Sequence, residues 1–414
     1  MAFNEESCRA AFPSLKNNQI FFDNTGGSQT LGAVIDSICD YYTHSNVQLD
    51  ASYAMSKQAT SRFDGAHDIC ASYINAQPDE IVLGSATTQL FRNLSFALKL
   101  NKGDEIIVSS IDHEANIAPW VDLAEQKGLS LKWWKPNHLT SPKLLANDLE
   151  AIISEDTKLV CCTHASNILG TITDIKSIAR VAHRYGALIC VDGVGYAPHR
   201  PVDVKDLGVD FYCFSWYKVY GPHISMLYGS RTAQHHVRPL NHFFNSNIGL
   251  SDKLGLAGAN YEMTQSLPHI IDYLGPAGGP MWNAIIEREE ILQTTLIDYL
   301  RSRPEITIYG EPHGDAKIRL STISFKVKGW NSQDFCEAIE AKTTYGVRSG
   351  TNYADRLVRE VLGLGRDGVV RVGMLHYNTL SEVHGFISTL DEVLSGISAK
   401  KLAVANGQNG QNGH

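Results

Sequence analysis

Lys218 stands where its amine can do chemistry. It follows an apolar run at 211–214, with Ser215 three residues before it and Gly221-Pro222 after it. A lysine inside a buried strand would be costly, so the pattern predicts a strand that ends in a polar turn. Ligands of α/β proteins bind at such strand ends, where an amine can form a Schiff base with a carbonyl compound. A surface lysine after a strand fits the same pattern, so the assignment depends on the rest of the chain.

Polar residues follow several other apolar runs in the same way. They are Thr87 and Thr88 after the run at 80–84, His113 after 105–109, Asn167 after 158–164, and Asp192 after 187–191. Helical patterns alternate with these runs, which predicts a mostly parallel sheet with right-handed crossovers. Each residue alone is explained by a turn, a helix cap or a structural histidine. Together, at one edge of one sheet, they form a candidate site.

These residues match the needs of a pyridoxal phosphate site. Lys218 would form the Schiff base, and Asp192 would keep the pyridine nitrogen protonated so that the ring accepts electrons. His113 would cover one face of the ring. The phosphate would bind amides and hydroxyls at a helix start, which the chain supplies at Ala86, Thr87, Thr88 and Ser215, with Tyr217 as a further contact.

The substrate of such a site would be a small amino acid. Arg371, after the apolar Val369-Val370, would bind the substrate carboxylate as a fork. Asn167 would hydrogen-bond the phenolic oxygen of the cofactor or that carboxylate. Asn24 and Thr25 lie in an Asn-Thr-Gly-Gly turn that brings small polar groups and bare backbone near a ligand, although an ordinary turn explains the same residues. Once released from the Schiff base, Lys218 would act as general acid or base at the α-carbon.

From about residue 20 to 394 the chain resembles the class V aminotransferase and cysteine desulfurase group of fold-type-I pyridoxal phosphate enzymes. The segments that carry the resemblance are 22–25, 86–88, 113–120, 166–170, 191–193 and 214–222. The resemblance implies an α/β fold with a large domain at 19–255, whose mostly parallel sheet has helices on both faces, and a smaller α+β domain at 256–397. We expect residues 1–18 to pack on the small domain. The resemblance also implies a homodimer with cofactor pockets at the subunit boundary.

The chain departs from this group at four places. Cysteine desulfurases carry a nucleophilic cysteine in a loop that corresponds to 349–355, where this chain has none. Tyr217 replaces the histidine of the usual Ser-x-His-Lys, and Gly195 replaces the glutamine of Asp-x-x-Gln. The threonine of Gly-Thr-x-Asn is absent from Ala257-Gly258-Ala259-Asn260, so only the backbone amide of Gly258 remains to bind the phosphate across the dimer.

These changes resemble a desulfurase-like subgroup that includes fungal enzymes such as the loline-type Mannich cyclase. The resemblance implies an α-carbanion, formed by loss of a proton or of carbon dioxide, that attacks an iminium in alkaloid ring closure. A carbon–sulfur lyase, an aminotransferase or an epimerase on the same scaffold stays open. So does an inactive binding module of the same fold.

The composition of the chain limits which classes of binding partner and which cellular compartment are expected. The chain has 414 residues and a formal net charge of −8, which argues against nucleic-acid and membrane-surface partners. We find no signal-peptide pattern, no apolar run of membrane-spanning length and no zinc-ligand spacing, so we expect a cytoplasmic protein without a structural metal. Several of its eight cysteines lie in apolar runs (Cys161, Cys162, Cys190, Cys213), as reduced core thiols would. The Asn-, Gln- and Gly-rich tail at 398–414 is expected to be disordered.

Overall fold

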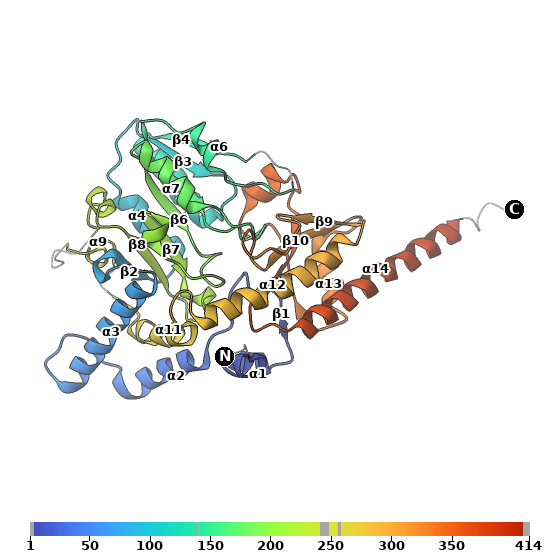
Figure 1. Cartoon of the computed structure of the whole chain (residues 1–414), viewed down its shortest axis with the longest axis horizontal. Coiled ribbons are helices and arrows are strands. Elements are labelled where there is room, and N and C mark those ends of the chain that lie inside the picture. Colours follow the sequence, from blue (N-terminus) through green and yellow to red (C-terminus); the bar gives the residue numbers. More distant parts are fainter. Residues whose placement is uncertain (1–3, 137–139, 241–247, 256–257, 409–414) are drawn as a thin grey trace.

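The computed structural model describes residues 4–136, 140–240, 248–255 and 258–408. Its largest feature is a seven-stranded sheet in the order β2-β8-β7-β6-β5-β3-β4 (Figure 1). The strands are β2 (Ile81–Gly84), β3 (Glu105–Ser109), β4 (Ser130–Trp134), β5 (Thr157–Thr163), β6 (Leu188–Asp192), β7 (Phe211–Ser215) and β8 (Ser225–Gly229). Strand β8 runs antiparallel to both of its neighbours and the other pairings are parallel, so the sheet is mostly parallel, as predicted.

Helices cover both faces of this sheet because its central strands are apolar on both sides. Along β5, Leu159 and Cys161 pack into one core cluster, whereas Val160 and Cys162 pack into another. Successive side chains of a strand point to opposite faces, so an uninterrupted apolar run is what a doubly covered strand requires. The first cluster includes side chains of α4 (Thr87–Ala97), α5 (Ala118–Lys127) and α9 (Leu250–Leu254), and the second includes side chains of α6 (Ala146–Glu150), α7 (Ile175–Arg184) and α8 (Val204–Leu207).

A separate antiparallel sheet lies in the C-terminal part of the chain, in the order β12-β13-β10-β9. Its strands are β9 (Ile306–Tyr309), β10 (Thr322–Val327), β12 (Arg348–Gly350) and β13 (Val369–Gly373). Side chains of α12 (Pro280–Arg301), α13 (Ser332–Glu340) and α14 (Leu380–Gln408) complete a third core with it. This is the smaller α+β region that the sequence indicated.

The N-terminal residues contact the C-terminal region. Strand β1 (Ile20–Phe21) pairs in parallel with β11 (Tyr345–Gly346) of the C-terminal region. Helix α1 (Glu5–Ala10) is held there as well, because Arg9 donates to the carbonyl of Tyr377 over 2.8 Å and pairs with Glu382 at 2.9 Å. The first residues therefore contact the C-terminal region, while the domain bounds stay a prediction.

Several elements differ from the sequence-based expectation. The helical pattern of residues 261–274 forms two helices instead of one, α10 (Tyr261–Ser266) and α11 (Pro268–Leu274), because Pro268 has no N–H with which to continue the first. Helix α3 (Ala54–Tyr73) and strand β4 were not predicted. In α3 the buried positions are mostly small, such as Ala59 and Ala66, so its apolar pattern is weak.

The remaining elements are short or lie at the surface. They are α2 (Gly32–Asp40), the π-helices at Tyr41–Ser45 and Arg356–Val361, and 3-10 helices at Pro13–Lys16, Pro78–Glu80, Glu114–Asn116, Trp216–Lys218 and Ala233–His236. Among the described residues no helix is both long enough and apolar enough to cross a membrane.

The last helix continues into the predicted tail. The sequence predicted a disordered tail from residue 398, whereas α14 continues to Gln408 and extends away from the rest of the molecule (Figure 1). Residues 399–403, Ala-Lys-Lys-Leu-Ala, are good helix formers, and the Asn- and Gly-rich composition begins only after them. The end of the predicted tail, residues 409–414, and the expected domain boundary at 255/256 lie at or beyond the edges of the described residues.

Candidate active site

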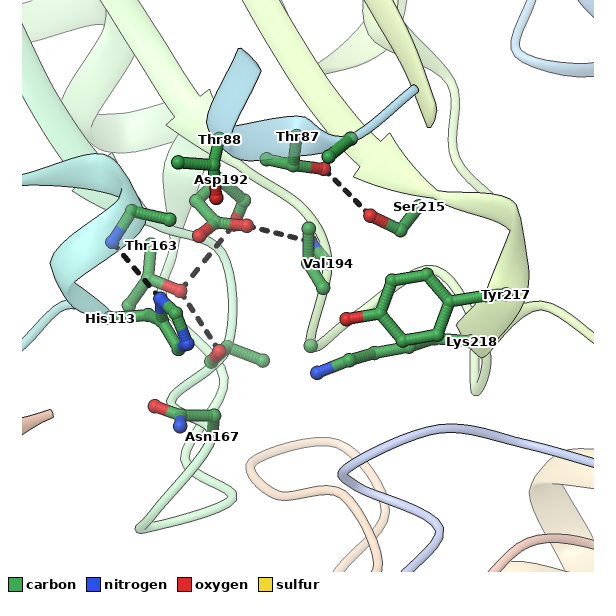
Figure 2. Close-up of a pocket in the computed structure, with 14 residues that line it drawn as sticks. Thr87, Thr88, His113, Thr163, Asn167, Asp192, Val194, Ser215, Tyr217 and Lys218 are labelled. Carbon is green, nitrogen blue, oxygen red and sulfur yellow. Dashed lines mark hydrogen bonds between the residues drawn. The ribbon is translucent and has the colours of Figure 1, made fainter. Parts of the chain in front are cut away.

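The strand-end residues singled out in the sequence do meet at one pocket. It lies at the carboxyl ends of β5, β6 and β7 and beside the start of α4 (Figure 2). Nine of its lining residues were predicted and five were not. The predicted ones are Ala86, Thr87, Thr88, His113, Asn167, Asp192, Ser215, Tyr217 and Lys218, and the others are Ala115, Thr163, Ala165, Val194 and Gly195. The topology explains this, because parallel strands present their carboxyl ends at the same edge.

Lys218 reaches the pocket from the 3-10 turn that follows β7. The side chain is 8% exposed, and its amine points into the pocket (Figure 2). Its Nζ lies 5.9 Å from the centroid of the Tyr217 ring, and among the described residues it makes no hydrogen bond or ion pair. Burial, and then the charge of Arg371, lower the pKa of this amine to about 8.

Asp192 is the last residue of β6 and is 3% exposed. Its Oδ1 accepts a hydrogen bond from the backbone N–H of Val194 over 2.8 Å. Burial raises the pKa of this carboxyl to about 6, while the Val194 N–H and Lys218 oppose that rise. The carboxylate is therefore held at the floor of the pocket by the turn that follows it.

The turn after Asp192 has no room for side chains at its two glycines. A Cβ on Gly193 would lie 2.2 Å from the ring of Tyr212, and a Cβ on Gly195 would lie 2.6 Å from the carbonyl oxygen of Ala165. The replacement of glutamine by Gly195 is thus more than a lost amide. The backbone here packs so closely that no side chain fits without a rearrangement.

The start of α4 offers a cup for an anion. Its N-cap position is Ala86, which supplies no side-chain cap, so the first amides of the helix lack one. Thr87 Oγ1 lies 2.7 Å from Ser215 Oγ and 3.3 Å from Ser225 Oγ, and the two serine hydroxyls are 2.8 Å apart. Ser225, on the antiparallel β8, was not predicted, because strand pairing rather than chain order brings it here.

His113 presents a neutral ring to the pocket. Its Nδ1 accepts a hydrogen bond from the backbone N–H of Ala115 over 3.0 Å, which leaves the proton on Nε2. Burial, with Lys218 and Arg371 adding to the effect, lowers the pKa of the imidazole to about 4. An uncharged, oriented imidazole is suited to lie against a flat ring.

Arg371 is placed less directly than the sequence suggested. It is 3% exposed, does not line the pocket, and donates to Asp23 over 2.8 Å and to the backbone carbonyl of Asn167 over 3.2 Å. Arg348, which the sequence analysis did not propose, also donates to Asp23, at 2.7 and 2.6 Å. One carboxylate therefore bridges two arginines behind the pocket, where a substrate carboxylate would have to compete with it.

Three predicted contacts lie away from the pocket. The amide of Asn24 is fully engaged, with its nitrogen donating to the carbonyls of Phe21 and Gly373 and its oxygen accepting from Tyr377. Thr25 Oγ1 pairs with Thr322 at 2.8 Å. Their hydrogen bonds join the N-terminal turn to the C-terminal strands, so we do not carry a substrate role for either residue further. Gly258 lines a different pocket with Ser85 and Gln89, and its neighbour Ala257 lies outside the described residues.

The missed lining residues had weak signals. Thr163 ends β5 opposite Asp192 in the parallel register and donates to the carbonyl of Ala165 over 2.9 Å. A polar residue at the end of an apolar strand was a signal that could have identified Thr163, but Asn167, in the loop that follows, was chosen instead. The other missed residues are apolar and gave no chemical signal in the sequence. They form part of the pocket wall: Ala115, Ala165 and Val194.

The residues present fit pyridoxal phosphate. A buried lysine amine without a partner is costly unless a ligand engages it. Here that amine, an uncapped helix start with three hydroxyls, a buried carboxylate and a neutral imidazole surround one pocket. These groups correspond to the aldehyde, phosphate, ring nitrogen and ring face of that cofactor.

Comparison with known proteins gives the same result. Residues 20–386 match the family model described as aminotransferase class-V. The aminotransferase-like protein FGM3 of Gibberella zeae is 52% identical over 95% of this chain and 99% of its own length. The nonribosomal peptide synthetase-like enzyme fsqF of Aspergillus fumigatus is 41% identical over 94% of this chain, which spans only 27% of fsqF.

A solved structure shows that the fold agrees as well. The apo cysteine desulfurase of Thermococcus onnurineus superposes with a TM-score of 0.86 at 27% identity, over 96% of this chain and all of that one. The predicted fold-type-I architecture is thereby confirmed. With the family match over most of the sequence, it follows that this chain belongs to the aminotransferase class-V family and is a pyridoxal-phosphate-dependent enzyme.

Proposed function

We propose that this enzyme acts on a small amino acid and turns its α-carbon into a carbon nucleophile for Mannich-type carbon–carbon bond formation or cyclisation, with or without decarboxylation, in alkaloid secondary metabolism. The observation that carries the proposal is the pocket itself, which has the groups for carbanion chemistry but no cysteine among its described lining residues. The similarity to part of a nonribosomal peptide synthetase-like enzyme supports a role in secondary metabolism.

When bound, pyridoxal phosphate supplies an electron sink that makes the α-carbon of an amino acid acidic. Asp192 is positioned to hold the proton of the ring nitrogen, because its buried carboxylate has one oxygen fixed by Val194. Lys218 is positioned to take and return a proton at the α-carbon. Because its pKa is lowered to about 8, a fraction of this amine is unprotonated near neutral pH, as a general base requires.

The two arginines are positioned to orient the substrate carboxylate. Arg371 and Arg348 share Asp23, so a carboxylate arriving from solvent can replace Asp23 on one of them without leaving a buried guanidinium unpaired. Such an exchange would require the bound substrate to carry a negatively charged carboxylate. It would also fix the orientation of the α-carbon above the pocket.

The positions of the cysteines argue against classical desulfuration. All eight are unpaired, and seven are buried, among them the four predicted core thiols. Cys39, the exposed one, lies on α2. Burial raises the pKa of Cys70 and Cys162, so these thiols are poor nucleophiles. A carbon–sulfur lyase, an aminotransferase or an epimerase would use the same Lys218 and Asp192. Only analysis of the reaction products distinguishes these activities.

The first test is spectroscopic. Protein incubated with the cofactor should absorb near about 420 nm, as expected for a protonated cofactor–lysine linkage. Lys218→Ala should lose the band, whereas the exposed Lys176→Ala on α7 should keep it. A wild-type protein that stays colourless would contradict the proposal and would favour a binding module without cofactor.

The second test is product analysis. The enzyme should be offered a panel of amino acids that includes N-substituted diamino acids, and the products should be identified by mass spectrometry and chiral chromatography. A cyclised or carbon–carbon coupled product is expected. Rapid sulfide release from cysteine, a keto acid, or simple racemisation would each point to one of the alternative reactions and contradict the cyclase proposal.

We also propose a homodimer in which Gly258 reaches the partner's cofactor phosphate, and a cytoplasmic location. The support is the similarity to cysteine desulfurases, not a contact within one chain. Sedimentation of the holoenzyme should give twice the mass of one chain. A monomer at micromolar concentration would contradict the dimer.

A further inference from the structure

The segment between β12 and the π-helix at Arg356–Val361 is fastened to the pocket wall. Asn167 donates from its side-chain amide to the backbone carbonyl of Asn352 over 2.9 Å. The backbone N–H of Glu114, the residue after His113, donates to the carbonyl of Tyr353 over 2.8 Å. Two successive carbonyls of the segment are thus held by residues at or next to the candidate active site.

A side-chain contact fastens the same segment from its other end. Arg356 Nε lies 3.1 Å from Glu114 Oε1, and its guanidinium lies over the ring of Trp133, 4.6 Å from the centroid. Both partners belong to the large-sheet part of the molecule. The segment is therefore a fixed wall in this structure.

The backbone conformation shows that these contacts dictate where Tyr353 lies. Asn352 and Tyr353 both have positive φ, 47° and 62°. Asparagine tolerates this region, but tyrosine rarely adopts it because its Cβ crowds the backbone there. Two neighbouring residues keep such angles only where the surroundings enforce them, and here the two carbonyl hydrogen bonds do so.

The result is a tyrosine side chain held beside the pocket but facing solvent. Its ring centroid lies 5.4 Å from that of His113, at an interplanar angle of 41°. The residue is 67% exposed, and among the described residues its hydroxyl has no hydrogen-bond partner.

We infer that Tyr353 recognises the part of the substrate beyond its α-carbon, with the phenol hydroxyl as hydrogen-bond partner of a polar group there. The reasoning is geometric. His113 lines the pocket that takes the cofactor, and Tyr353 stands next to His113 outside that lining, so a substrate side chain leaving the α-carbon toward solvent passes it. The inference rests on the proposed amino-acid substrate. It selects the class of amino acids whose side chain carries an amine, hydroxyl or amide.

The test uses the holoenzyme and measures binding instead of turnover. Dissociation constants of L-alanine, L-2,4-diaminobutyrate, L-homoserine and L-glutamine are taken from the change in the cofactor absorbance band. Tyr353→Phe keeps the ring and the backbone and removes only the hydroxyl. We expect it to weaken binding of at least one polar amino acid by about 3- to 10-fold, the effect of one lost hydrogen bond, and to leave L-alanine within about 2-fold.

Tyr53→Phe serves as the matched control, because Tyr53 is another exposed tyrosine, at the start of α3. It should change none of the four constants. Arg356→Ala, which loosens the segment without touching the phenol, should reduce the same discrimination between polar amino acids and L-alanine. A Tyr353→Phe variant that weakens all four amino acids equally, or none, would overturn the inference while leaving the proposed function standing. If no amino acid alters the wild-type band, the proposed function and the inference fail together.

Discussion

Burial sets the protonation states of the groups that face one another in the pocket. It lowers the pKa of Lys218 to about 8 and that of His113 to about 4, and it raises that of Asp192 to about 6. At neutral pH the imidazole is therefore uncharged and the carboxylate mostly ionised. That combination is what the ring face and the ring nitrogen of the cofactor need.

Asp112 is a fourth titrating residue, one position before His113. It is buried, its Oδ2 accepts from Asn116 over 2.7 Å, and its Oδ1 has no partner among the described residues. Burial, aided by the charge of Asp192, raises the pKa of this carboxyl to about 8, although Ser109 and Asn116 oppose the rise. The folded protein therefore binds a proton that the unfolded chain releases at much lower pH.

Asp112→Asn should change the pH dependence of stability. A raised pKa in the folded state gives stability that is present below pH 4 and is lost as the pH rises through about 8. Asparagine stays neutral at both pH values. The free energy of unfolding of the variant, relative to that of the wild type, should therefore increase by more than about 1.4 kcal/mol from pH 5.5 to pH 8.5, the equivalent of one pKa unit. Urea denaturation of the cofactor-free protein at both pH values measures this. Asp298→Asn, at the exposed face of α12, should show no such trend.

At the scale of elements, strand register builds the arginine pair. Arg348 of β12 lies directly opposite Arg371 of β13, and Asp23 comes between their guanidinium groups from the turn after β1. Like charges facing each other across two strands are unfavourable. The shared carboxylate offsets this repulsion until a second anion arrives.

Arg371→Ala should affect the substrate far more than the cofactor. The substrate concentration needed for half-maximal signal should rise at least about 10-fold, as expected when a charge-assisted hydrogen bond is lost. The pyridoxal phosphate dissociation constant should change less than about 3-fold, because the proposed phosphate cup at α4 is untouched. Both values can be titrated by absorbance. Equal losses in the two constants would show that Arg371 serves the cofactor instead.

At the scale of the whole molecule, buried polar contacts join the two regions. Glu289 of α12 is fully buried and accepts from His199 over 2.9 Å and from Arg200 over 3.1 Å, both of which follow β6 in the chain. Asn24 joins the N-terminal turn to β13 in a similar way. Buried polar contacts of this kind therefore hold the C-terminal region against the large-sheet region.

Glu289→Ala should be strongly destabilising. It leaves Arg200 buried without its carboxylate, and such losses cost about 3–5 kcal/mol. Thermal or urea unfolding of the cofactor-free protein measures the loss. Arg231→Ala breaks an exposed ion pair with Asp79 and should cost less than about 1 kcal/mol. A Glu289→Ala variant as stable as the control would show that the two regions do not depend on this contact.

The sequence alone determined the chemistry of the pocket and the edge of the sheet at which it forms. Lys218, Asp192, His113, Thr87 and Asn167 could be predicted because each follows its own strand. Local patterns set the strands, and parallel packing brings their ends together. The cofactor followed from residue types at those ends.

Only the tertiary structure decided what surrounds that pocket. The Asp23–Arg371 pair joins residues 348 positions apart, and the Asn167–Asn352 contact joins residues 185 apart. No spacing in the chain encodes such contacts, since they depend on how the C-terminal region packs against the large-sheet region. For the same reason Asn24 looked like a ligand contact in the sequence. Its amide is instead consumed by partners, such as Gly373 and Tyr377, that only the fold brings to it.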